Sequence, residues 1–291
     1  MQGAERSLLD LVIHLDRKRF EPLVILPWRG PMEETLRQTH ISYVIRFTPC
    51  WISSPNRISW SYPFTWLSGL RARLWSLLAL IEREKIDLVY TNTSTLLEGA
   101  LAARRARLPH VWHIHEHLCG NADLHCPIPP FWIDKLTLAL SARIITPSHA
   151  LAKARFPNAA KVRVVPNGID LNAFNSGDGQ RLRQELGISS KAPVITCIGA
   201  ISRTKDPLTF IRAAAVVQRR FPNAHFLLAG TVADPELERQ ARALAQTESL
   251  KVHFLGYRHD VADLLAAATV HVSTSNQESF GRTLVEAMAS G

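Results

Sequence analysis

The segment that decides the fold is residues 270–291, which read Val270-His-Val-Ser-Thr-Ser-Asn-Gln-Glu-Ser-Phe-Gly-Arg-Thr-Leu-Val-Glu-Ala-Met-Ala-Ser-Gly291. Its start alternates in the manner of a buried strand, and residues 283–289 have apolar side chains at helical spacing. A strand, a polar loop and a helix N-terminus present free backbone N–H groups to an anion, and Gly281 lets a ligand approach closely. Glu278 and Glu286 flank this point, and carboxylates accept hydrogen bonds from sugar hydroxyls. The segment therefore predicts a sugar-nucleotide site.

Length and composition indicate two globular domains. The chain has 291 residues, of which 46% are hydrophobic and 20% charged, which argues against wholesale disorder. No apolar run approaches the roughly 18 residues of a membrane-spanning helix, and the N-terminus lacks a secretory signal pattern. The cysteines have no framework spacing, so a reduced, cytoplasmic setting is expected; they are Cys50, Cys119, Cys126 and Cys197.

The basic excess lies in the first part of the chain. Residues 1–170 hold 21 Lys and Arg against 14 Asp and Glu, and the whole chain has a net charge of +9. Residues 49–70 interleave arginine with aromatic side chains, namely Trp51, Arg57, Trp60, Tyr62, Phe64 and Trp66. This pattern is typical of a membrane-interface element, so peripheral contact with an anionic membrane is one hypothesis. The alternative is that the tryptophans belong to the core. Nucleic-acid binding is not expected.

The order of elements predicts α/β architecture. An amphipathic helix over residues 3–16 opens with Gln2-Gly3-Ala4-Glu5, a Gly-rich turn that no strand precedes. Strands then alternate with helices, and the strands are predicted at 22–27, 41–47, 87–92, 110–117, 143–147, 194–199, 225–230, 252–256 and 270–275. Such alternation implies parallel sheets covered on both faces, which bind ligands outside the carboxyl ends of their strands. The turn at 166–168, Pro-Asn-Gly, closes the first half, and residues 172–191 are predicted as a polar bridge.

Two of these stretches resemble family 4 glycosyltransferases. Residues 278–286 match the family's E-x7-E signature, and residues 166–170, Pro-Asn-Gly-Ile-Asp, resemble the turn with which it leaves its first domain. The resemblance implies the GT-B architecture, in which two doubly wound Rossmann-like domains face each other across a cleft. Residues 1–170 are expected to form the acceptor-side domain, without its first strand. Residues 171–291 are expected to form an incomplete donor nucleotide-sugar-binding domain, so the chain resembles one clipped at both ends.

Residues 199–206, Gly-Ala-Ile-Ser-Arg-Thr-Lys-Asp, follow the first strand of the second half and open a helix. A cation beside a helix N-terminus favours the binding of an anion at that place. The stretch resembles the family's diphosphate motif, with Ala200 where the family usually has Arg and Arg203 as the expected replacement. The resemblance implies donor binding by Lys205, Arg203, Phe280, Gly281, Glu286 and Gly3, with Glu286 on the ribose. It implies Glu278 as a catalytic residue on the transferred sugar.

Three histidines alternate near the end of the strand predicted at 110–117. His113, His115 and His117 would face one side of that strand, and a metal site with Glu116, Cys119, His125 and Cys126 is one hypothesis. The spacing does not match a compact zinc site. In the family the corresponding strand ends in a His that faces the sugar and acceptor, which implies His115 as a catalytic residue. His113 and His117 are expected in core or surface roles.

The resemblance implies a retaining transfer of a hexosyl unit from a nucleotide diphosphate sugar to an acceptor hydroxyl, in the biosynthesis of glycans, glycolipids or cell-envelope polysaccharides. Cations and helix amides can stabilise a leaving diphosphate, so no metal or other cofactor is expected. The alternatives are a nucleotide-sugar epimerase of the same fold and a non-catalytic sugar-nucleotide-binding module. The expected partners are a nucleotide-sugar donor and a glycan or lipid-linked acceptor, in the cytoplasm or at the inner face of the membrane.

Overall fold

A computed structural model describes residues 3–52 and 62–291. The chain divides into two compact units, Met1–Gly168 and Ile169–Gly291, here called the first and the second unit. Gln2, Arg57 and Trp60 lie outside the described residues. Among the described residues, no helix has the length and apolar character needed to span a membrane.

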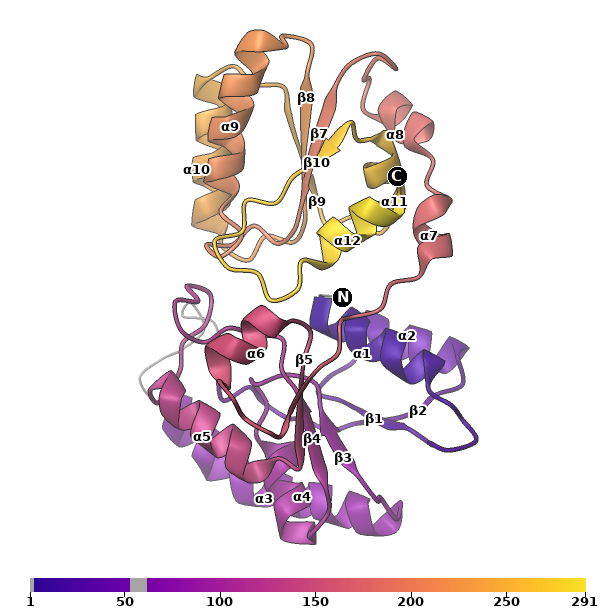
Figure 1. The fold of residues 1–291 in the computed structure, drawn as a ribbon, viewed down its shortest axis with the longest axis vertical. Helices are drawn as coiled ribbons and strands as arrows, with labels where there is room; N and C mark the ends of the chain where they lie inside the picture. The colour runs from indigo at the N-terminus through magenta and orange to yellow at the C-terminus, as the bar shows by residue number, and fades with distance from the viewer. Residues whose placement is uncertain (1–2, 53–61) are drawn as a thin grey trace. The chain divides into compact units, whose positions relative to one another are not determined.

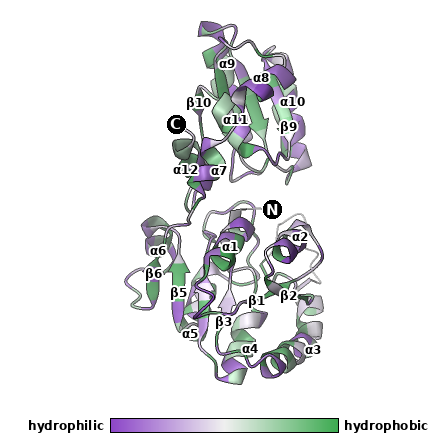
Figure 2. Ribbon diagram, turned by 90° about the vertical axis from the view of Figure 1, so that its right-hand side faces the viewer, coloured by the Kyte–Doolittle hydropathy of each residue, from purple (hydrophilic) through white to green (hydrophobic). Residues whose placement is uncertain are grey.

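The first unit contains two parallel sheets (Figure 1). One pairs β1 (Leu23–Leu26) with β2 (Ser42–Ile45). The other has the order β3-β4-β5-β6, with β3 (Val89–Thr91), β4 (His110–His113), β5 (Arg143–Thr146) and β6 (Val162–Val164). Its helices are α1 (Gly3–His14), α2 (Pro31–Gln38), α3 (Tyr62–Arg83), α4 (Glu98–Ala106), α5 (Pro130–Leu140) and α6 (His149–Arg155). Figure 2 shows β5 in the colour of hydrophobic residues, as expected for a strand covered on both faces.

The core of the first unit includes two of the tryptophans from residues 49–70. Trp51 and Trp66 pack in the same hydrophobic cluster as the fully buried Trp112. Their indole N–H groups donate to backbone carbonyls, from Trp51 to Ser94 O at 2.9 Å and from Trp66 to Pro49 O at 3.2 Å. These two side chains are core residues, whereas Phe64 is 67% exposed.

The second unit has one parallel sheet with the order β10-β7-β8-β9. Its strands are β7 (Val194–Ile198), β8 (His225–Ala229), β9 (Val252–Gly256) and β10 (Val270–His271). Its helices are α7 (Leu171–Asn175), α8 (Gly179–Glu185), α9 (Pro207–Arg220), α10 (Pro235–Thr247), α11 (Val261–Ala267) and α12 (Arg282–Ala289). Figure 1 shows α9 and α10 on one face of the sheet and α8, α11 and α12 on the other. The parallel sheets with helices on both faces agree with the predicted α/β class.

The polar segment predicted at 172–191 contains most of α7 and all of α8, which the sequence did not indicate. Asp170 and Asp178 cap these helices, since their side chains accept from the amides of Asn172 and Arg181. Phe174 and Leu182 anchor the two helices in the interior. Helices of one or two turns contain too few apolar positions to show a periodic pattern.

The strand predicted at 110–117 is shorter than expected and ends at His113. Beyond this point the amide of His115 donates to the Glu116 carboxylate at 3.3 Å rather than to a neighbouring strand. His115 and His117 therefore lie beyond the end of β4, although the ring centroids of His113 and His115 are 4.0 Å apart. Likewise β10 spans only Val270–His271, and residues 273–281 form a loop that leads to α12.

Candidate functional site

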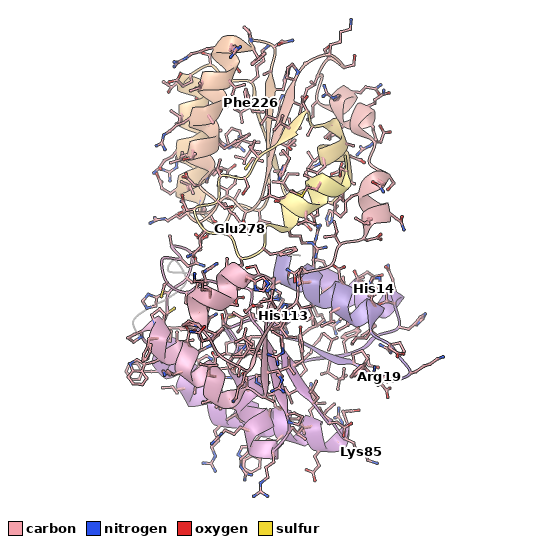
Figure 3. All side chains as sticks on the ribbon, viewed as in Figure 1. His14, Arg19, Lys85, His113, Phe226 and Glu278 are labelled. Carbon is pink, nitrogen blue, oxygen red and sulfur yellow. The ribbon has the colours of Figure 1, made fainter. Side chains whose placement is uncertain are left out.

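Three of the predicted donor residues meet at the N-terminus of α12. Lys205 Nζ donates to Glu278 Oε2 at 2.6 Å, and the amide of Gly281 donates to Glu278 Oε1 at 3.2 Å. Figure 3 shows Glu278 on the loop that leads into this helix. The Glu278 carboxylate thus binds a cation and a helix-terminal amide. These are the groups that are expected to bind an anionic ligand.

Hydrogen bonds between two loops hold this cluster together. The Thr274 hydroxyl lies 3.0 Å from the carbonyl oxygens of both Lys205 and Asp206, and the backbone amide of Asn276 donates to Thr204 O at 2.9 Å. These bonds fix the loop after β7 against the loop after β10. Lys205 and Glu278 can therefore meet although 73 positions separate them in the chain.

Gly281 has a backbone conformation that favours glycine. Its φ is +78°, in the left-handed region. A Cβ at this position would lie 3.2 Å from Leu284 Cδ1 and 3.5 Å from Glu278 Cγ. Glycine therefore allows the loop to turn into α12 with its amide aimed at the Glu278 carboxylate.

The charge of Glu278 is maintained by its neighbours. Burial alone would raise its pKa, but the nearby Lys205 ammonium and hydrogen bonds from Lys205, Ser275 and the Gly281 amide lower the pKa below its usual value. Glu278 is therefore ionised at neutral pH, and its contact with Lys205 is an ion pair. Lys205 Nζ is therefore already engaged by a carboxylate in this structure.

Arg203 lies in different surroundings from Lys205. Its Nε donates to Asp234 Oδ2 at 3.3 Å, and its side chain is 67% exposed. Arg203 and Asp234 line a cavity of about 310 Å³ together with Asp206, Glu236, Leu237, Gln240 and Asn276. The structure thus brings Arg203 to carboxylates, and its predicted role on a diphosphate stays a prediction.

Glu286 is buried inside the second unit, with 1% of its surface exposed. Its Oε1 accepts from Arg282 Nε at 2.8 Å, one helical turn earlier. The predicted role of Glu286 on a ribose stays a prediction, and the structure shows its carboxylate paired with Arg282. Phe280 is partly buried beside Gly281 at the end of the loop.

Asn92 links His115 to the first turn of α1, which contains Gly3. His115 Nε2 lies 3.1 Å from Asn92 Oδ1, and Asn92 Nδ2 donates to Ala4 O at 2.7 Å, directly after Gly3. Asn92 thus joins the start of α1 to the histidine. Sequence reasoning missed it, although its position just after β3, at a carboxyl strand end, could have marked it.

His113 has the core role that was expected for it. Figure 3 shows it in the interior of the first unit, where its Nδ1 lies 2.7 Å from the Tyr90 hydroxyl. Burial, with a smaller effect of His115, lowers its pKa to about 3. Burial also lowers the pKa of His115, against the opposing effect of Glu116. Both rings are therefore neutral near pH 7.

The Glu116 carboxylate accepts hydrogen bonds from the loop that follows β3. Its carboxylate accepts from the hydroxyl of Thr93 and from the amide and hydroxyl of Ser94, the last two at 3.0 and 2.7 Å. Arg155 Nη1 donates to Ser94 Oγ and to Glu116 O, both at 3.0 Å. Across residues 3–52 and 62–291, no three His, Cys, Asp or Glu side chains are grouped as metal ligands.

Family comparisons cover both units. The sequence model of Glycosyltransferase Family 4 matches residues 1–173, and that of Glycosyl transferases group 1 matches residues 178–291. These matches confirm the family resemblance that the sequence motifs indicated.

Individual relatives agree with the family matches. The chain is 28% identical over 235 residues to the UDP-Gal:alpha-D-GlcNAc-diphosphoundecaprenol alpha-1,3-galactosyltransferase of Escherichia coli, covering 75% of this chain and 59% of that one. It is 32% identical over 213 residues to D-inositol 3-phosphate glycosyltransferase 1 of Catenulispora acidiphila, covering 66% and 51%. The chain therefore spans between half and three fifths of these relatives' lengths.

Solved structures show the same architecture. Anabaena Alr3699/HepE in complex with UDP-glucose matches with a TM-score of 0.78 and 25% identity, over 100% of this chain and 75% of that one. The same protein in complex with UDP and glucose matches with a TM-score of 0.77. These likenesses confirm the predicted GT-B fold.

Proposed function

We propose, since this chain belongs to Glycosyltransferase Family 4, that it transfers a hexosyl unit from a nucleotide diphosphate sugar to an acceptor hydroxyl. The observation that carries the proposal is the Lys205–Glu278–Gly281 cluster, which places a cation, a carboxylate and a helix-terminal amide together. Complexes of Anabaena Alr3699/HepE with UDP and UDP-glucose support a uridine diphosphate sugar as the donor. The relatives' names favour transfer over the epimerase and the non-catalytic binding module.

In this proposal the second unit binds the donor. The diphosphate takes the place of the Glu278 carboxylate at Lys205 Nζ and at the Gly281 amide, the two groups that Glu278 occupies at 2.6 and 3.2 Å. Glu278 is thereby released to accept hydrogen bonds from hydroxyls of the transferred sugar. Preorganised donors of this kind stabilise the negative charge that develops on a leaving diphosphate, and no metal is needed for that step.

We assign the acceptor side to the first unit, with His115 as a neutral hydrogen-bonding residue toward sugar or acceptor hydroxyls. The bond between the anomeric carbon and the phosphate oxygen breaks as the acceptor oxygen bonds to the same face of that carbon. The acceptor proton passes to the departing phosphate oxygen, and attack from the same face retains the anomeric configuration. A carboxylate nucleophile is less favoured, because Glu278 lies beside the groups proposed to bind the diphosphate, Lys205 and the Gly281 amide, and Glu286 is buried against Arg282.

Each glutamate can be tested by conversion to glutamine, which keeps its volume. Glu278→Gln is expected to lower turnover of a UDP-hexose roughly 10–100-fold without weakening donor binding, because Lys205 is then free for the diphosphate. Glu286→Gln is expected to weaken donor binding roughly 10-fold. Calorimetric titration with the UDP-hexose and a turnover assay give the two values, with Glu248→Gln, a change at the exposed end of α10, as the control. If both variants keep the wild-type affinity and rate, the assignment of Glu278 and Glu286 to the donor site is wrong.

We further propose that the acceptor is a glycan or a lipid-linked sugar of the cell envelope, reached by peripheral contact with an anionic membrane. The name of the Escherichia coli relative supports a lipid-linked acceptor. The first turn of α5 supports the contact, because Phe131 and Trp132 are 59% and 60% exposed and Lys135 lies 5.3 Å from the centre of the Phe131 ring. Exposed aromatics beside a cation suit the headgroup region of a bilayer.

Vesicle binding tests the membrane contact directly. Trp132→Ser is expected to lower co-sedimentation with vesicles that contain anionic phospholipid roughly 10-fold or more, since insertion of a large apolar side chain contributes about 1.5–3 kcal/mol. Trp28→Ser is the matched control, because Trp28 is 59% exposed in the same unit but lies outside α5. Equal loss in both variants, or none in either, would contradict a contact through α5.

A further inference from the structure

Asn92 stands between two groups whose chemistry fixes its orientation. Its Nδ2 lies 2.7 Å from the carbonyl oxygen of Ala4, and a carbonyl oxygen can only accept a hydrogen bond. The amide nitrogen of Asn92 must therefore face Ala4, which leaves its Oδ1 facing His115 Nε2 at 3.1 Å. Since Oδ1 can only accept, His115 must carry its proton on Nε2.

We infer that Asn92 is a positioning residue which holds His115 as the neutral Nε2–H tautomer, leaving Nδ1 as the ring nitrogen that accepts a hydrogen bond from a ligand hydroxyl. A neutral imidazole donates from one nitrogen and accepts at the other, so fixing one fixes both. The same side chain ties the first turn of α1, beside Gly3, to the histidine. This inference deepens the role given to His115 above and rests on the proposed function only for its effect on turnover.

The surroundings of His115 favour the neutral ring that this inference needs. The ring of His113 lies with its centroid 4.0 Å away, and Tyr90 engages His113 Nδ1 at 2.7 Å. The carboxylate of Glu116, the acidic neighbour, is held by Thr93 and Ser94. Its remaining contact with His115 is to the backbone amide, so Asn92 is the side chain that selects the tautomer.

Long-range ¹H–¹⁵N NMR spectroscopy of uniformly ¹⁵N-labelled protein reports the tautomer without any ligand. The His115 signals are assigned by their loss in His115→Gln. We expect the Nε2–H pattern for His115 in the wild-type protein, and a mixture of both tautomers in Asn92→Ala. A dominant Nδ1–H form in the wild type, or an unchanged tautomer in Asn92→Ala, overturns the inference. Asn172→Ala, at an exposed Asn of the second unit, is the matched control and should leave the pattern unchanged.

Asn92→Asp separates a positioning role from a purely structural one. The variant loses the donor to Ala4 but keeps an acceptor beside His115 Nε2, now with a negative charge. It should retain the Nε2–H tautomer and raise the pKa of His115 by roughly 1–3 units, because an adjacent carboxylate favours the imidazolium. NMR titration measures this shift, and an unchanged titration overturns the inference.

The turnover of a UDP-hexose distinguishes this inference from the proposed function. With both correct, Asn92→Ala lowers kcat and Asn92→Asp restores part of it, with the pH profile displaced toward higher pH. If the NMR results hold while turnover is the same in all three proteins, the Asn92–His115 geometry is supported and the catalytic assignment of His115 is wrong. If the NMR results fail while the wild type turns over donor, the inference is overturned and the proposed function stands.

Discussion

Replacing Lys205 by alanine is expected to weaken binding of a UDP-hexose roughly 10–100-fold, since hydrogen bonds to charged groups contribute about 1.5–3 kcal/mol each. Turnover should fall further, roughly 100–1,000-fold, because the cation stabilises charge that develops on the leaving diphosphate. The structural basis is the 2.6 Å contact between Lys205 Nζ and Glu278. The same carboxylate accepts from the Gly281 amide at the start of α12, so the ammonium and the amide lie close enough to bind one anionic group. Calorimetric titration and single-turnover kinetics measure the two effects.

Lys191→Ala is the matched control, because Lys191 is an exposed lysine of the same unit, in the loop before β7. The control should bind and turn over donor as the wild type does. A Lys205→Ala protein with wild-type affinity would show that the diphosphate lies elsewhere, for example beside Arg203.

Replacing Arg155 by alanine is expected to lower the free energy of unfolding of the first unit by about 3–5 kcal/mol, the usual result of removing one partner from a buried ion pair. The side chain of Arg155 is 3% exposed and bonds to Asp134 Oδ1 at 2.6 Å. It also bonds to Ser94 Oγ and Glu116 O, so it connects α5, α6 and the loops after β3 and β4. Its loss leaves Asp134, whose side chain is 16% exposed, without the guanidinium.

Tryptophan fluorescence isolates this effect, since all seven tryptophans lie within residues 1–168. Denaturant titrations therefore report the unfolding of the first unit alone. Arg163→Ala, which removes an exposed arginine bonded to the local carbonyls of Ala160 and Val162, is the control and should change the free energy by less than about 0.5 kcal/mol. Equal unfolding curves for Arg155→Ala and Arg163→Ala would contradict a structural role for the buried network.

The alternation of strands and helices could be predicted from sequence because burial on both faces of a parallel sheet imposes local apolar runs. Prediction from sequence fails where a tertiary contact decides at which residue a strand or helix ends. The strand before His115 ends at His113, where the Glu116 carboxylate takes the His115 amide. Similarly, α7 and α8 depend on single anchors, Phe174 and Leu182, rather than on a pattern.

In the candidate site, too, local motifs could be predicted from the sequence, whereas tertiary contacts could not. The proximity of Lys205, Glu278 and Gly281 follows from motifs at neighbouring strand ends, and the structure does bring the three together. The partners of buried polar groups could not be predicted, because they join segments far apart in the chain. Asn92 reaches an atom 88 residues away at Ala4, and Glu116 reaches 22 residues back to Ser94. Arg203, predicted to face a diphosphate, lies against Asp234.

The most direct test of the central claim is a turnover assay of the wild-type chain with a UDP-hexose and a sugar acceptor, run in EDTA and followed by ¹H NMR of the product. If Lys205 and the α12 amide bind the diphosphate as proposed, UDP and a glycoside with the donor's own anomeric configuration should form, at a rate that EDTA does not change. Binding of the donor without any transfer, an inverted product, or activity lost in EDTA and restored by Mn²⁺ would contradict the account.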